Sequence, residues 1–173
     1  MVLAVAHTLL AILYVDLFKR ITKTNLLTKW HFFATAIAGL LPDSDIIIRF
    51  IIKNILKMPL PNLLDHRGIF HTPFFALIFF IPGIILFFTK KRNIAIYLLI
   101  ATFGIMLHIS LDYITSGGIH DGIMWLYPIS THAYQGIIGF VYDVDLLTIS
   151  LDAFLLITWF FYILKTKRLK EFF

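Results

Sequence analysis

The chain alternates long apolar stretches with short basic clusters, and this alternation restricts what it can fold into. Of its 173 residues, 60% are hydrophobic, and the mean hydropathy is +0.88. Soluble domains have roughly 45–50% apolar residues, whereas crossing a hydrocarbon core about 30 Å thick takes ~20 apolar residues per helix. Five segments approach that length, at residues 2–18, 30–51, 73–89, 94–114 and 146–164. We expect an all-α fold, a polytopic membrane bundle of about five transmembrane helices, in a single domain over residues 1–173.

The basic residues predict how this bundle is oriented. Most of the 15 lysines and arginines fall in three clusters: Lys19, Arg20, Lys23 and Lys29; Lys90, Lys91 and Arg92; and Lys165, Lys167, Arg168 and Lys170. If the five segments alternate in direction, the clusters share one side, which the positive-inside rule makes cytoplasmic. We expect a multi-pass protein of the cell membrane with its N-terminus outside and its C-terminus in the cytoplasm. The first segment lacks a basic leader and a cleavage site, so we interpret it as a retained helix. Such short clusters do not favour a nucleic-acid partner.

Most of the remaining polar residues fall on the opposite side of the membrane. His7 lies near the outer end of the first segment, and the aspartates of "PDSD" (42–45) lie near that of the second. The stretch "HRGIFHT" (66–72) opens the third segment, and "HISLD" (108–112) lies near the outer end of the fourth. His120 and His132 fall in the following outer loop, so six of the seven histidines are predicted to converge on one face.

These residue types at these spacings point to a metal site. His108 and Asp112 are four residues apart, so they share one helix face and can bind one ion. Asp43 and Asp45 flank a position where a helix would end and could bridge two cations. Gly68 suggests a turn that directs His66 and His71 inward. The candidate ligands are His7, Asp43, Asp45, His66, His71, His108 and Asp112. Imidazole and carboxylate without any cysteine suit Zn²⁺, Mn²⁺ or Fe²⁺.

Other interpretations of the same residues are open, and some catalytic classes are excluded. His7 alone could be a helix–helix hydrogen-bond partner, and "HRGIFHT" alone could be a loop that contacts lipid phosphates. We interpret His31, beside Trp30, as an interfacial residue. Asp16 and Asp152 are expected in helix packing, although Asp152 could support the site. The only glutamate, Glu171, lies in the C-terminal tail, which excludes an HExxH metalloprotease. No G-x-S-x-G elbow is present.

Several of these stretches carry a family resemblance. His7, "LLPDSD", "HRGIFHT", "HISLDYITSGG" and "LYPIS", in this order, resemble the YdjM-type membrane-bound metal-dependent hydrolases. That family is similar, more distantly, to zinc-dependent phospholipase C and the single-strand-specific zinc nucleases. The resemblance implies hydrolysis of a phosphoester by metal ions held by histidine and aspartate. Those soluble enzymes also use an N-terminal tryptophan and a histidine–glutamate pair, which this chain lacks, so we expect two metal ions, most readily Zn²⁺.

The combined hypothesis is a membrane-embedded metal-dependent hydrolase, phospholipase-like, with its site facing the extracytoplasmic side. A metal-activated water would attack the phosphoester of a lipid or lipid-linked substrate. Asp43 would position or deprotonate that water, and Arg67 would pair with a phosphate oxygen. Membrane lipids are the expected partners, and the sequence does not indicate an oligomeric state. A divalent-metal transporter, or a catalytically silent assembly protein with a structural metal, would need the same residue types.

Overall fold

The described part of the chain is mostly helical. The structure, a computed structural model, describes residues 4–59, 68–115, 122–136 and 144–168. Its elements are α1 (Ala4–Thr22), α2 (Lys29–Ala38), α3 (Ser44–Phe50) with a π-helical turn (Ile51–Ile55), a 3₁₀ turn (Ile69–His71), α4 (Pro73–Phe87), α5 (Arg92–Thr115) and α6 (Val144–Thr166). Within the described ranges there is no strand, only an isolated bridge between Ile123 and Tyr134. The all-α prediction is confirmed.

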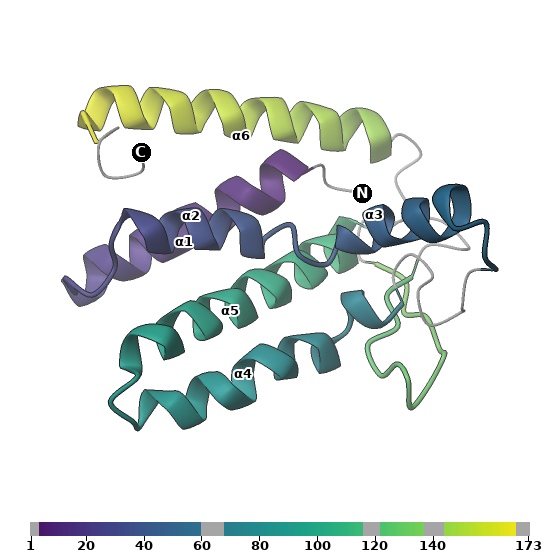
Figure 1. Ribbon diagram of the computed structural model, residues 1–173. Coiled ribbons are helices and arrows are strands. Elements are labelled where there is room, and N and C mark those ends of the chain that lie inside the picture. The colour runs from purple at the N-terminus through teal and green to yellow at the C-terminus, as the bar shows by residue number, and fades with distance from the viewer. Residues whose placement is uncertain (1–3, 60–67, 116–121, 137–143, 169–173) are drawn as a thin grey trace.

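Helix α5 is the centre of the bundle. It packs against α4, α2 and α1, and α1 in turn packs against α6 (Figure 1). Glycines permit two of these contacts, because a Cβ on Gly104 of α5 would lie 2.5 Å from Ala38 Cβ, and one on Gly39 would lie 2.8 Å from the carbonyl oxygen of His7. Gly39 has an ordinary helical φ of −64°. The glycines are therefore required for close packing and not for an unusual backbone conformation.

The second predicted segment, 30–51, is wrong as one continuous helix. Helix α2 ends at Ala38, and α3 begins only at Ser44, continuing in the direction of α2 (Figure 1). Pro42 explains part of the interruption, since a proline has no amide hydrogen to donate and disfavours helical geometry at the residue before it. Ten residues of α2 extend about 15 Å, half the thickness of a hydrocarbon core.

By length and composition, α5 is the one described helix that could cross a membrane unaided. Helix α4 is similarly apolar but has 15 residues, and α1 contains Asp16, Lys19 and Arg20 in its C-terminal half. Asp16 is buried and accepts hydrogen bonds from Arg20, Tyr162 and Arg168, which join α1 to the end of α6. Its predicted function in helix packing is confirmed.

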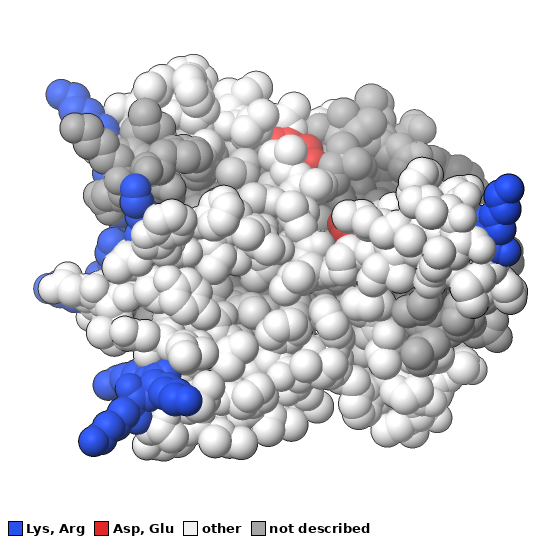
Figure 2. Space-filling view, viewed as in Figure 1, with Lys and Arg blue, Asp and Glu red and all other residues white. Residues whose placement is uncertain are grey.

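Most of the visible basic residues gather at one end of the bundle. The end of α1, the turn between α4 and α5, and the end of α6 lie at this end, and their lysines and arginines form the larger blue region of Figure 2, with a smaller blue group at the opposite end. We call the end with the larger region the basic end. Side chains along the bundle between the ends are largely apolar even where exposed, as in α4 with Ile78, Ile81 and Ile85. Such a surface is typical of a protein surrounded by lipid.

Candidate metal centre

Buried histidines and aspartates from separate parts of the chain meet at the end of the bundle opposite the basic end. His7 comes from α1, His71 from the 3₁₀ turn before α4, and both His108 and Asp112 from α5. All four side chains are 0–1% exposed. Helix α4 begins with Thr72 as its N-cap residue and Pro73 at the first helical position, where a proline is favoured. His71 therefore lies directly before the N-terminus of α4.

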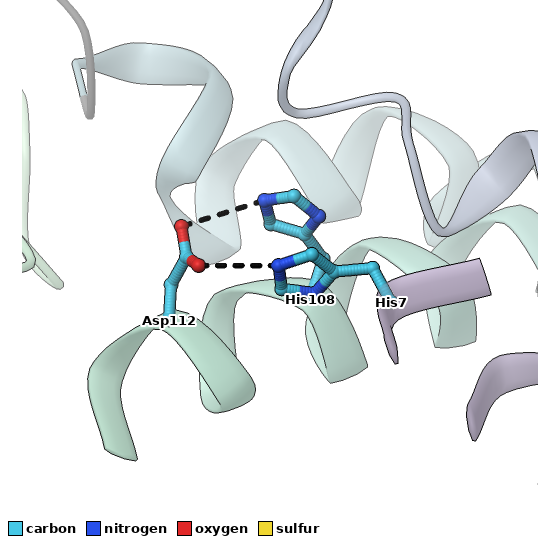
Figure 3. Close-up of side chains that lie close together, drawn as sticks. All are labelled: His7, His108 and Asp112. Atoms are coloured by element: carbon cyan, nitrogen blue, oxygen red, sulfur yellow. Dashed lines mark ion pairs between the residues drawn. The ribbon is translucent and has the colours of Figure 1, made fainter. Parts of the chain in front are cut away.

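Asp112 lies at the middle of the cluster. One carboxylate oxygen, Oδ1, is 3.3 Å from His7 Nε2, and the other, Oδ2, is 3.5 Å from His108 Nε2, as the dashed lines in Figure 3 show. The same Oδ2 is 3.6 Å from His71 Nε2. The rings of His7 and His108 are stacked with centroids 3.9 Å apart. The spacing of four residues between His108 and Asp112 therefore gives the shared helix face that the sequence predicted.

Asp43, in the break between α2 and α3, closes a ring of four donor atoms. Its Oδ1 is 3.5 Å from His108 Nε2 and 3.6 Å from His71 Nε2. The four atoms of the ring are Asp43 Oδ1, His71 Nε2, His108 Nε2 and Asp112 Oδ2. The Asp43 side chain is 22% exposed, so it is the member of the ring that solvent can reach.

Polar atoms of the cluster are buried without ordinary partners. His7 Nδ1 and Nε2, His108 Nε2, Asp43 Oδ1 and both carboxylate oxygens of Asp112 make no hydrogen bond within the described residues. An unsatisfied buried polar group costs about 1–3 kcal/mol, and more when it is charged. A bound cation would satisfy several of these atoms at once. The groups His7–His108–Asp112 and Asp43–His71–His108 each have the geometry to hold a metal ion.

A backbone carbonyl sets the tautomer of His108. Its Nδ1 lies 2.7 Å from the carbonyl oxygen of Gly39. A carbonyl oxygen can only accept, so Nδ1 must carry the hydrogen, which leaves the lone pair of Nε2 directed at the ring of donors. Gly39 lies in the break and approaches α5 because Gly104 has no side chain. The contact of the Gly39 carbonyl with His108 was not predicted. Its only trace in the sequence is a glycine directly before the "LLPD" stretch.

Asp45 lies behind His71 and outside the ring. Its Oδ2 is 3.7 Å from Nδ1 of His71, the nitrogen on the far side from the donors of the ring. A carboxylate in this position is typical of the groups that orient a metal-binding histidine. The sequence analysis proposed Asp45 as a direct ligand, and the structure gives it the place of a supporting group.

Asp152 supports the site through the backbone. It is buried in α6, and its Oδ1 accepts a hydrogen bond of 3.1 Å from the amide of Ala6, the residue before His7. This contact ties α6 to the start of α1. The contact agrees with both interpretations that the sequence left for Asp152, helix packing and support of the site, because it holds the residue next to His7.

The remaining predicted residues, His66, Arg67 and His31, do not belong to the described cluster. His66 and Arg67 lie outside the described residues, so their assignments as ligand and phosphate-binding group stay predictions. The interpretation of His31 as interfacial stays a prediction, and the structure adds that its side chain is buried. Its Nδ1 accepts a hydrogen bond from the Thr28 amide at the start of α2, and its ring stacks on Tyr97. His31 therefore caps a helix near the basic end.

Comparison with known proteins identifies the family. The family model described as "YdjM inner membrane protein" matches residues 1–171, almost the whole chain. The chain therefore belongs to this family and is a membrane protein. No curated protein matches it, and no solved structure does.

Proposed function

We propose that this member of the YdjM family is a membrane-embedded metal-dependent hydrolase with its metal centre at the extracytoplasmic end of a five-pass bundle. One observation carries the proposal: buried donor atoms of three histidines and two aspartates converge at 3.3–3.6 Å in a mostly apolar bundle. The broken second pass adds support. Non-helical backbone at membrane depth is tolerated where it lines a protein interior or cavity, and this break supplies both Asp43 and the Gly39 carbonyl.

The proposed centre holds two zinc ions. Donor atoms about 2.1 Å from a tetrahedral zinc lie roughly 3.4 Å apart, close to the 3.5–3.6 Å edges of the ring. Asp43, His71, His108 and Asp112 would hold one ion. His7 Nε2 and Asp112 Oδ1, 3.3 Å apart, would hold the second, with Asp112 bridging both. His66 is the predicted additional ligand. Mn²⁺ and Fe²⁺ accept the same donor types.

Ions bound there would supply Lewis acidity and a water of lowered pKa. Asp43 is placed to orient that water and to take its proton, because it is the exposed member of the ring. Asp45 holds the His71 ring in place from behind, and Gly39 does the same for His108. Arg67 is the predicted partner of a phosphate oxygen.

The proposed substrate is the phosphoester of a lipid or lipid-linked molecule. The site lies toward one end of a bundle whose flanks are apolar, and a position at the depth of lipid headgroups is part of the proposal. Helix α3, which begins beside Asp45, exposes Ile46, Ile47 and Phe50 to the surroundings. These side chains could enter the outer leaflet next to the site.

A structural metal is the second candidate, and the burial of the ligands favours it. His7, His71, His108 and Asp112 are almost inaccessible, whereas a catalytic zinc needs an open position. The exposed edge of Asp43 is what distinguishes the two functions. A transporter is less well supported, because transporter sites lie near the membrane midplane and this cluster lies toward one end.

The test is phosphate release from vesicles of phosphatidylglycerol and phosphatidylcholine by purified protein with added Zn²⁺ or Mn²⁺. We expect turnover that a chelator abolishes and metal restores. Asp43→Asn should reduce turnover by about 100-fold or more, with the protein still folded and still metal-loaded through His7, His71 and His108. Thr102→Ala, whose hydroxyl bonds within α5 to Leu98, is the control and should keep full activity. A metal-loaded protein inactive on every phosphoester lipid would favour the structural metal instead.

A further inference from the structure

A cavity lies away from the metal centre, toward the basic end. It has a volume of about 610 Å³, between α1, the end of α4 and the first half of α5. Its walls are aliphatic and aromatic, with Tyr14 and Phe18 from α1 and Leu99, Ile100 and Phe103 from α5 among them. Pockets of 300–1,000 Å³ with apolar walls and a few polar groups are typical of ligand sites. The proposed hydrolase does not use this cavity.

The polar groups of the cavity suit an anion. Arg92 is the charged residue among those that line it, and its guanidinium lies 4.5 Å from the centroid of the Phe87 ring. Thr24 also lines it, and its hydroxyl oxygen accepts a hydrogen bond from the Leu26 amide, which leaves the hydroxyl hydrogen for an acceptor. Further lysines stand at this end of the bundle (Figure 2).

We propose that this cavity binds one anionic phospholipid, with an acyl chain along the apolar walls and the phosphate against Arg92 and Thr24. An amphiphile with a long apolar chain and a negative head matches a groove that is apolar along its length and cationic where the basic end begins. Basic pockets between membrane helices are known to take anionic headgroups. The lipid is a bound component and not a substrate, because it lies away from the metal ligands.

The test is lipid binding to the purified protein in detergent, measured by native mass spectrometry with phosphatidylglycerol and phosphatidylcholine of identical chains. We expect one bound phosphatidylglycerol, preferred over phosphatidylcholine. Arg92→Gln should lower the affinity for phosphatidylglycerol about fivefold, the effect of one basic residue at an anionic surface, and leave phosphatidylcholine unchanged. Lys165→Gln removes the same charge from α6 at the same end, outside the groove, and should change neither.

A second variant tests the apolar walls. Ile96→Trp fills part of the groove and should weaken binding of both lipids, while metal content and melting temperature stay at wild-type values and show that the protein is folded. The proposal would be overturned if the wild-type protein bound phosphatidylglycerol and phosphatidylcholine with equal affinity and Arg92→Gln did the same. The proposal would also be overturned if the wild-type protein were a dimer and Ile96→Trp made it monomeric without reducing lipid binding. The cavity would then be occupied by a second copy of the chain.

Discussion

Asp112 is the residue on which the metal centre depends most. Its two oxygens face different histidines, His7 on one side and both His71 and His108 on the other. The sequence predicted its pairing with His108, because a separation of four residues on a helix fixes a shared face. It could not predict which oxygen faces which ring, since that depends on how three helices pack.

Asp112→Asn keeps the shape of the side chain and removes the charge that lets it bridge two ions. We expect a folded protein that retains at most one ion and hydrolyses phosphoesters about 100-fold more slowly or worse. Circular dichroism, metal analysis and phosphate release measure the three effects. Wild-type turnover in the folded variant would remove Asp112 from the mechanism.

Asp45→Asn distinguishes a supporting group from a ligand. Loss of the carboxylate behind His71 should weaken metal binding by about 10–100-fold, and an excess of zinc should restore full occupancy. Competition with a chromophoric chelator gives the affinity. Ser44→Ala changes the neighbouring residue at the start of α3 and should bind metal like wild type. An occupancy that excess zinc does not restore would make Asp45 a direct ligand.

At the scale of elements, the break between α2 and α3 was predicted only in part: Asp43 and Asp45 were expected to flank a helix end, but the break begins already at Gly39. Hydropathy over 30–51 is continuous, so those residues were predicted as one helix, although "GLLPD" holds a glycine and a proline. The Gly39 carbonyl depends on the packing of α2 against α5, and no periodicity in a single sequence contains that information. The boundaries of α4 and α5, by contrast, were predicted to within two residues at each end, since caps and charges mark them.

Gly104→Ala tests this packing. The added Cβ would lie 2.5 Å from Ala38 Cβ and 2.8 Å from the Ala38 backbone carbon, so α2 must move away from α5. Overpacking of this kind costs about 1–3 kcal/mol, and displacement of Gly39 should also weaken metal binding. Thermal unfolding and metal affinity measure the two effects.

Gly83→Ala is the matched control for Gly104→Ala. Its Cβ would lie 3.2 Å from Leu98 Cβ and from Leu99 Cδ2, so the neighbours need to move by only a few tenths of an ångström. We expect little loss of stability and no change in metal affinity. Equal losses in both variants would show that the α2–α5 contact has no special connection to the metal centre.

At the scale of the whole molecule, the basic clusters and the histidine–aspartate cluster lie toward different ends of the bundle. The described members of the three basic clusters lie at one end (Figures 1 and 2), where α1 ends and α5 begins, whereas His7 near the start of α1 and His108 and Asp112 near the end of α5 lie toward the other. The sequence could predict this because alternating helices return equivalent loops to the same side. The match to the family of YdjM inner membrane proteins shows that the chain is a membrane protein. Its orientation in the membrane is part of our proposal.

The absence of cysteine gives a direct test of this orientation, since any introduced cysteine is unique. Asn93→Cys, at the start of α5, should be protected from a membrane-impermeant maleimide in intact cells and react after lysis. Thr131→Cys, in the exposed loop of residues 122–136, should react in intact cells. Labelling of both positions from the same side would exclude the proposed topology.

The central claim is that the buried histidines and aspartates form a metal centre, and metal analysis of purified protein tests it most directly. Inductively coupled plasma mass spectrometry should find about two zinc ions, or two ions of another divalent transition metal, per chain of the wild-type protein. His108→Ala removes a ligand of the first ion, a residue that belongs to both groups with the geometry to hold a metal, and it should reduce the content to at most one equivalent in a protein that still folds. A folded wild-type protein that contains no metal, and takes up none from excess zinc, would contradict the account.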